Sequence, residues 1–199
     1  GKFRSVDPHV VLQRLYPEDF HVDIMYEFNA NDINFWKKYQ IVHFHRSIGH
    51  DYDQAVNLIK GLKSLGIVTI MDLDDYWLPT KEHPIHSLIV QNKIHEKIIN
   101  NLKVADYVIT TTEMFANEIR KINKNVVVTE INRETGEQTQ RPIKPHETVW
   151  YQYEKIMTDN YHGIDQNYVD FLMKFKEEPY TNMDNQPYVR VWTRPVNQY

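Results

Sequence analysis

Apolar, β-branched stretches recur along residues 1–128 and alternate with stretches of helical periodicity. In most of the strand-like stretches, the residues that would point to either face of a sheet are apolar. This pattern is typical of strands buried on both sides of a parallel sheet. The predicted strands are His21–Ile24, Ile41–His45, Ile67–Leu73, Tyr107–Thr110 and Asn125–Val128, with a further short alternating strand at Tyr188–Trp192.

Helical patterns fill the intervals between these strands. Asp53–Leu65 repeats aliphatic residues on one face, and Gly66 follows as a stop signal. Further helices are predicted from Asp7-Pro8 onward, with Asp7 as the N-cap, and over Pro84–Ala105, Thr112–Ile122, His146–Asp159 and Asp165–Phe175. Strands that alternate with helices of this length predict right-handed βαβ units.

The sequence therefore predicts an α/β fold with a Rossmann-like parallel sheet over residues 1–128. Residues 129–199 differ in character, because Thr129–Pro145 is polar and rich in turn residues. We expect residues 129–199 to be a fragment of a second α/β domain, with the boundary near Val128–Thr129.

Composition narrows the classes of partner and the compartment. The net charge is −4, from 23 basic and 27 acidic residues without a basic stripe, which argues against a nucleic acid as partner. The absence of cysteine excludes disulfides and Cys-ligated zinc and fits a cytoplasmic location. No apolar run is long enough to predict a transmembrane helix, and peripheral contact with the inner face of a membrane is left open.

Polar side chains follow the strand Ile41–His45. Ligands of parallel α/β sheets bind beyond the carboxyl ends of the strands, so His45 and Arg46 are candidate site residues. A histidine can move a proton near neutral pH, and an arginine can pair with an anionic group. His43, by contrast, is expected to point into the core and to hold a main-chain carbonyl.

Three carboxylates, Asp72, Asp74 and Asp75, end the most apolar strand, and Tyr76 and Trp77 follow directly. The carboxylates could accept hydrogen bonds from sugar hydroxyls, act as a general base or bind a metal, while the aromatic rings could stack on a sugar. A simpler alternative is a helix or turn start with Asp75 as the cap. The Asp-x-Asp pattern is too short to identify a metal site, and we expect none.

Four segments together carry a family resemblance. Gly1-Lys-Phe-Arg-Ser-Val-Asp-Pro, Ile41-Val-His-Phe-His-Arg, Ile70-Met-Asp-Leu-Asp-Asp-Tyr-Trp-Leu-Pro and Ala105-Asp-Tyr-Val-Ile-Thr-Thr-Thr-Glu resemble the N-terminal domain of bacterial GT-B glycosyltransferases of the group 1 type. The resemblance covers about residues 1–128.

This resemblance implies transfer of a hexose from a nucleotide-sugar donor to a glycan, lipid-linked or protein acceptor, with no obligatory metal and no other cofactor. It implies His45, Asp74 and Asp75 as catalytic candidates. The implied acceptor-side residues also include Gly1, Lys2, Arg46 and Thr111. The donor is held mainly by the second domain in this family. Arg190 or Arg194 could hold the diphosphate of the donor, and Arg194 is the candidate because an arginine can bind phosphate oxygens through two hydrogen bonds.

The chain also departs from the family pattern. It has six glycines and no glycine-rich loop, and Val128 runs into Thr129-Glu-Ile-Asn rather than a Pro-Asn turn. We therefore expect segments to be missing before Gly1, after Tyr199 and between Val128 and Thr129, where a main-chain break should appear.

Two other functions stay open at this point. The first is a non-catalytic glycan-binding or assembly module of the same fold, favoured by the many Tyr and Trp residues. The second is a receiver-like signalling domain, which requires a lysine at the end of a late strand, where this chain has Thr110-Thr-Thr-Glu. The sugar-transfer hypothesis depends on one expectation, namely that Ile41–Arg46 and Ile67–Asp75 end side by side at the same edge of a parallel sheet.

Overall fold

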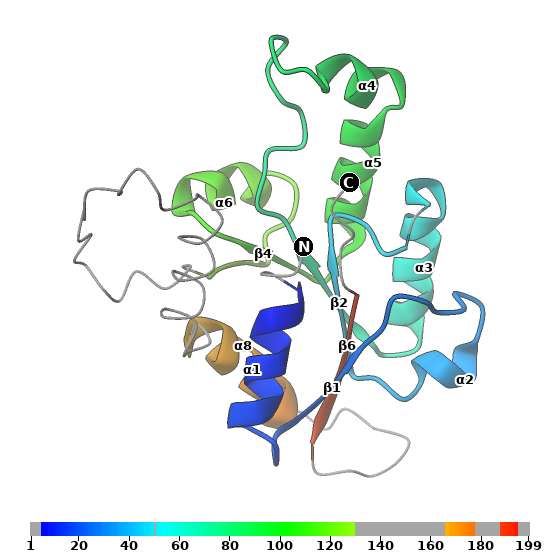
Figure 1. The fold of residues 1–199 in the computed structure, drawn as a ribbon, viewed down its shortest axis with the longest axis vertical. Coiled ribbons are helices and arrows are strands. Elements are labelled where there is room, and N and C mark those ends of the chain that lie inside the picture. Colours follow the sequence, from blue (N-terminus) through cyan, green and yellow to red (C-terminus); the bar gives the residue numbers. More distant parts are fainter. Residues whose placement is uncertain (1–4, 50, 130–165, 178–187, 195–199) are drawn as a thin grey trace, which may run out of the picture.

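The computed structural model describes residues 5–49, 51–129, 166–177 and 188–194, and these form one all-parallel, six-stranded sheet (Figure 1). The strand order is β1-β6-β2-β3-β4-β5. The strands are β1 (Phe20–Ile24), β2 (Ile41–His45), β3 (Val68–Asp72), β4 (Tyr107–Thr110), β5 (Val126–Val128) and β6 (Val189–Thr193). The predicted Rossmann-like parallel α/β sheet is confirmed.

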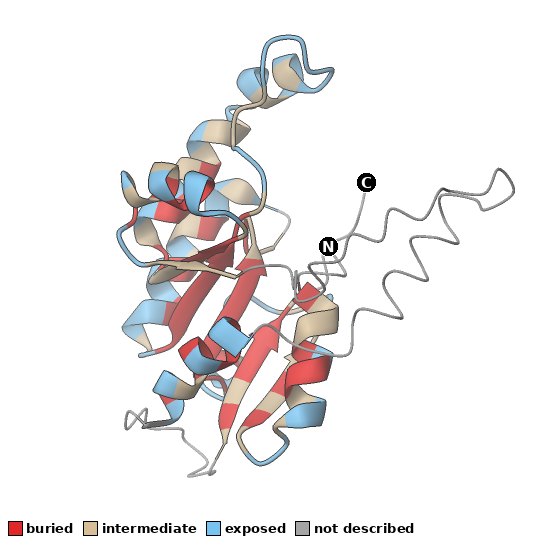
Figure 2. Ribbon diagram, turned by 90° about the vertical axis from the view of Figure 1, so that its left-hand side faces the viewer, coloured by how far each residue is buried: buried red, intermediate tan, exposed pale blue. Residues whose placement is uncertain are grey.

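Helices cover both faces of this sheet and enclose two apolar clusters. The described helices are α1 (Asp7–Leu15), α2 (Ile33–Trp36), α3 (Tyr52–Ser64), α4 (His86–Gln91), α5 (Ile94–Val104), α6 (Glu113–Arg120) and α8 (Gln166–Glu177). One cluster joins Leu12 of α1 and Leu172 of α8 to Ile70 of β3. The other joins Ile59 of α3 and Leu102 of α5 to the opposite side of the sheet. The strands are therefore buried between helices whose outer sides are exposed (Figure 2).

Local signals explain where several helices begin and end. Asp51 precedes α3 and its side chain accepts a hydrogen bond from the Asp53 N–H, while Gly66 ends the segment at φ +77°. The Thr112 hydroxyl caps α6 by accepting from Phe115 N. The prediction for α1 was wrong in one respect, because Asp7 lies inside its first turn, where a carboxylate favours the helix dipole, and Val6 occupies the cap position.

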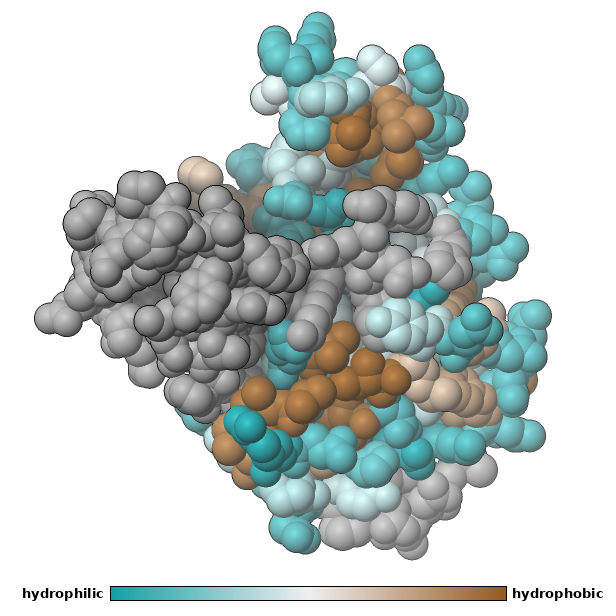
Figure 3. All heavy atoms as spheres, viewed as in Figure 1, coloured by the Kyte–Doolittle hydropathy of each residue, from teal (hydrophilic) through white to brown (hydrophobic). Residues whose placement is uncertain are grey.

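The single helix predicted over Pro84–Ala105 is two helices in the structure. Lys93 adopts the left-handed conformation, with φ +54°, between α4 and α5. The apolar face continues through Ile98 and Leu102, whereas Val90 of α4 is 42% exposed. The segment that contains α4 projects from the body of the molecule (Figure 1), and its apolar side chains form a patch at the top of Figure 3.

Among the described residues after 129, β6 joins the same sheet and α8 packs against it. β6 lies between β1 and β2, because Val189 and Val191 on one face and Trp192 on the other are all buried. α8 packs its apolar face against the same sheet as α1. Thr129 N donates to Thr110 O at 2.8 Å, which continues the β4–β5 ladder past residue 128. The helix predicted at His146–Asp159 lies outside the described residues.

No helix among the described residues combines the length and the apolar composition that a bilayer span requires.

Candidate functional site

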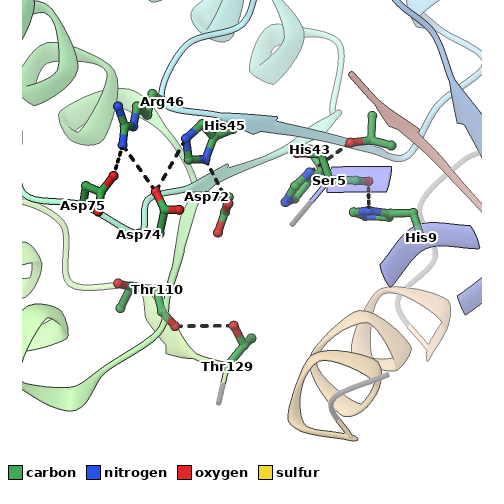
Figure 4. A network of polar contacts seen from close by, with 11 residues as sticks. Ser5, His9, His43, His45, Arg46, Asp72, Asp74, Asp75, Thr110 and Thr129 are labelled. Carbon is green, nitrogen blue, oxygen red and sulfur yellow. Dashed lines mark hydrogen bonds and ion pairs between the residues drawn. The ribbon is translucent and has the colours of Figure 1, made fainter. Parts of the chain in front are cut away.

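The carboxyl ends of β2 and β3 lie side by side, as the sequence predicted. The two strands are parallel, and their register places His45 opposite Asp72. The side chains of His45, Arg46, Asp72, Asp74 and Asp75 meet at this edge of the sheet (Figure 4). The loop after each strand therefore contributes to one polar cluster, which is the candidate site.

At the centre of the cluster, His45 and Asp72 form a buried pair. His45 Nδ1 and Asp72 Oδ2 are 3.0 Å apart, and the side chains are 8% and 2% exposed. The carboxylate can only accept, so Nδ1 carries the proton of this bond. The other ring nitrogen, Nε2, is 3.6 Å from Asp74 Oδ1. That distance exceeds a hydrogen bond, and an oxygen atom of a ligand could bridge the two groups.

The outer part of the cluster is a more exposed ion pair. The Arg46 guanidinium pairs with Asp75 Oδ2 and is 3.5 Å from Asp74 Oδ1. Asp75 is 73% exposed, and exposed ion pairs contribute about 0–1 kcal/mol, so polar groups of a ligand could replace this contact. The alternative that Asp75 caps a helix is wrong, because the next helix, α4, begins at His86.

Arg46 also has an unusual backbone conformation. Its φ is +56°, in the left-handed region, where a residue with a Cβ costs about 1–2 kcal/mol. The turn is tight, since Ser47 N donates to His45 O at 2.6 Å. The Arg46 N–H donates to Asp72 O at 3.0 Å, and the Asn101 side chain on α5 donates to Arg46 O at 3.0 Å.

A second group of buried polar side chains lies on the α1 and α8 face of the sheet. His43 Nδ1 and Thr193 Oγ1 are 3.0 Å apart, and His43 is 2% exposed, so it points into the core as expected and bonds a hydroxyl there. His9 packs against it with ring centroids 4.6 Å apart. His9 Nδ1 donates to Ser5 O at 2.7 Å, and Nε2 accepts from the Tyr168 hydroxyl at 2.8 Å.

The proton positions of that group follow from its partners. A main-chain carbonyl can only accept, so the His9 proton is on Nδ1 and the ring is neutral. Burial lowers the pKa of His9 to about 4, against the effects of the Ser5 carbonyl and of the Asp72 charge, which both raise it. His9 therefore carries no charge at pH 7 and serves as a fixed hydrogen-bonding group between α1 and α8.

Two predicted aromatic residues lie just beyond the carboxylates. Tyr76 and Trp77 stack on one another, with centroids 4.4 Å apart and an interplanar angle of 25°, and both rings approach Phe115 at about 6 Å. Tyr76 is 52% exposed. The pair is thus supported from α6 while one of its rings stays accessible.

The remaining predicted residues are distributed more widely. Thr111 directly follows β4 at the same edge of the sheet, half-buried. Arg194 follows β6, with its guanidinium 5.6 Å from the centre of the Phe28 ring. Arg190 is held in an ion pair with Asp23, with Nη2 and Oδ2 2.7 Å apart, and this pair joins β6 to β1. Gly1 and Lys2 lie outside the described residues.

Sequence reasoning missed a hollow of about 710 Å³ between the segment after β1 and helix α3. Phe28, Trp36 and Asn57 are among its lining residues, together with Gly49 and Gly61, and a Cβ at Gly61 would meet nothing within 4 Å. Its walls belong to the α3 face of the sheet, whereas His45 and Asp72 share the face of His43. Among the described residues, no three His, Asp or Glu side chains are grouped so that they could hold a metal ion.

Comparison of the chain with protein-family models, with curated proteins and with solved structures finds no match in any of the three. The structure itself shows a parallel, Rossmann-like α/β sheet with a polar cluster at its carboxyl edge.

Proposed function

We propose that the chain is a glycosyltransferase of the GT-B type, which moves a hexose from a nucleotide-sugar to a hydroxyl of a glycan, lipid or protein acceptor. The observation that carries the proposal is the buried Asp72–His45 pair, whose second ring nitrogen faces Asp74 at the carboxyl edge of the sheet. A base in this place is oriented by one carboxylate and lies beside another that can bind a sugar hydroxyl.

The chemistry that this arrangement supports has defined proton and bond changes. His45 Nε2 takes the proton of the acceptor hydroxyl while the hydroxyl oxygen bonds to the anomeric carbon of the donor sugar. The bond from that carbon to the diphosphate breaks, and the nucleoside diphosphate leaves. Asp72 fixes the ring through Nδ1 and stabilises the imidazolium that forms, as an aspartate does in a serine protease triad.

The other residues of the cluster bind and orient the acceptor. Asp74 accepts a hydrogen bond from the reacting hydroxyl or its neighbour, because its Oδ1 is within 3.6 Å of both the His45 ring and the Arg46 guanidinium. Arg46 donates to a second oxygen of the acceptor once its contact with Asp75 has broken. The exposed Tyr76 ring offers an apolar surface for the sugar. Within the described residues, Arg194 is the candidate for the donor diphosphate.

A second candidate function is glycan binding without transfer. It is favoured by the Tyr76–Trp77 stack, because accessible aromatic rings beside carboxylates also suit a sugar-binding module. This function requires the carboxylates and the aromatic rings but no proton transfer by His45.

Calorimetry and product analysis with a panel of nucleotide-sugars and acceptor glycans test the proposal. We expect nucleotide-sugar binding, release of nucleoside diphosphate and a glycosylated acceptor. The His45→Gln and Asp72→Asn variants should each lower turnover by about a hundredfold or more. His83→Gln, at an exposed position in the segment before α4, is the matched control and should leave turnover unchanged.

The outcomes separate the candidates. Glycan binding that survives in His45→Gln, without any nucleotide binding by the wild type, supports the module instead. Binding of neither class of ligand rules out both functions.

A further inference from the structure

The turn at Arg46 directs two consecutive side chains, those of His45 and Arg46, towards the same carboxylate, Asp74. In an extended strand, neighbouring side chains point to opposite faces of the sheet. Here His45 Nε2 and Arg46 Nη2 lie 3.6 Å and 3.5 Å from the same oxygen, Asp74 Oδ1. The left-handed conformation of Arg46 makes this possible, because it reverses the chain directly after His45.

This conformation is unfavourable for arginine and needs support from outside the loop. Glycine, which has no Cβ, and asparagine, which has a short polar side chain, adopt positive φ with little strain. Arginine is neither of these types. Its N–H is bound by Asp72 O on the neighbouring strand. Its carbonyl is bound by the Nδ2 group of Asn101, which comes from helix α5, 55 residues further along the chain.

The burial of the Asn101 side chain destabilises the apolar core around it. It is fully buried on the face of α5 that carries Ile98 and Leu102, where apolar residues fit best. Its amide nitrogen faces the Arg46 carbonyl, while its Oδ1 is buried without a hydrogen-bond partner among the described residues. An unsatisfied buried carbonyl is destabilising, so packing of the helix does not account for the residue.

We propose that Asn101 is a positioning residue of the candidate site, which holds the Arg46 turn and thereby directs His45 and Arg46 onto Asp74. The proposal rests on the proposed sugar transfer for its effect on turnover. Asn101 acts through the main chain of Arg46 and takes no part in the chemistry.

The test compares two variants of Asn101 with a matched buried asparagine in the full chain. Asn101→Ala removes the donor, and Asn101→Asp replaces it by an acceptor of the same shape. Asn123→Ala is the control, because Asn123 is also buried and its Nδ2 donates to two main-chain carbonyls, Leu102 O and Ala105 O, both at 2.8 Å.

The first readout is structural and needs no activity. Backbone chemical shifts or a crystal structure of the Asn101 variants should show that Arg46 has left the left-handed region and that the His45–Asp74 approach is lost. The second readout is kinetic. We expect kcat for sugar transfer to fall roughly ten- to a hundredfold, with the acceptor KM changed less than about threefold, because misplacement of a base slows chemistry more than binding.

Asn123→Ala should lower the melting temperature at least as much as the Asn101 variants and leave kcat within about twofold. An Arg46 turn that is unchanged in both Asn101 variants overturns the positioning role alone, and so does a relaxed turn with unchanged kcat. Absence of transfer by the wild-type protein removes the proposed function and the positioning role with it.

Discussion

At the scale of single residues, the buried imidazoles of His9 and His45 differ in the groups that face their ring nitrogens. His45 faces two carboxylates, Asp72 and Asp74. His9 faces two uncharged partners, the Ser5 carbonyl and the Tyr168 hydroxyl. A proton added to Nε2 of His9 would break the bond from Tyr168 inside the core, whereas the partners of His45 are carboxylates at the edge of the sheet. The two residues fit different roles, one in chemistry and one in stability.

The His9 environment predicts acid-sensitive stability. The pKa of His9 is about 4 in the folded protein against 6.5 for an unperturbed histidine, so between these values the unfolded chain binds more protons. Stability should therefore be complete above about pH 6.5 and decline as the pH falls towards 4. The shift corresponds to a loss on the order of 3 kcal/mol. Urea unfolding between pH 4 and 7.5 measures it.

The His9→Gln variant should show a shallower fall in stability over this pH range, and the His83→Gln variant, at an exposed position, should behave like the wild type. An identical pH slope in His9→Gln and the wild type would contradict the assignment.

Single residues of the site were predictable where the signal is local. His45, Arg46 and the aspartates lie at the ends of predicted strands or directly after them, and the rule for ligands of parallel sheets points to them. His9 and Asn101 were not identified, because their partners are distant in sequence: Tyr168 lies 159 residues from His9, and Arg46 lies 55 residues from Asn101. No spacing within the chain encodes such contacts.

At the scale of elements, the strands were easier to predict than the helix boundaries. A strand buried on both faces appears in the sequence as a short run of apolar residues. The predicted range of β2 agrees with the structure at both ends. The break between α4 and α5 occurs at Asn92-Lys93, without glycine or proline to announce it. The four-residue α2 is too short to show periodicity, although Asp32 caps it through its side chain.

The break at Lys93 predicts a stabilising substitution. Lys93→Gly should raise the free energy of unfolding by up to about 1 kcal/mol, because glycine adopts a φ of +54° without steric strain. Lys103→Gly is the matched control within α5, where the same replacement should lower stability by about 1 kcal/mol. Thermal unfolding of both variants measures the difference. A loss of stability in Lys93→Gly as large as in Lys103→Gly would argue that the left-handed residue is not strained.

At the scale of the whole molecule, the sheet is completed by β6, a strand from the last described segment of the chain. β6 is the only described neighbour of β1 and separates it from β2. Its Trp192 is fully buried and meets Trp36 and Phe28 edge to face at 5.2 Å. The sequence predicted this strand but not its place, because the alternation of Tyr188–Trp192 defines a strand without naming its partners.

The position of β6 between β1 and β2 predicts which strands lose protection when one of its residues is replaced. Trp192→Ala should destabilise the protein by about 3–5 kcal/mol through the cavity it leaves. Hydrogen exchange should then accelerate more in the β1 amides than in those of β4. The half-buried Trp77 is the control, since Trp77→Ala should cost about 1 kcal/mol and leave β1 protected. Equal acceleration in β1 and β4 would show that β6 does not anchor β1 in particular.

The late arrival of β6 has a consequence for biosynthesis. A ribosome releases β1 long before the strand that must flank it, so the nascent chain holds β1 without a hydrogen-bonding neighbour while β2 to β5 emerge. Until then the apolar rim of β2 lies open to other chains, and non-local strand pairing of this kind is slow. The facing edges of β1 and β2 should therefore stay exposed during synthesis until β6 emerges and inserts between them.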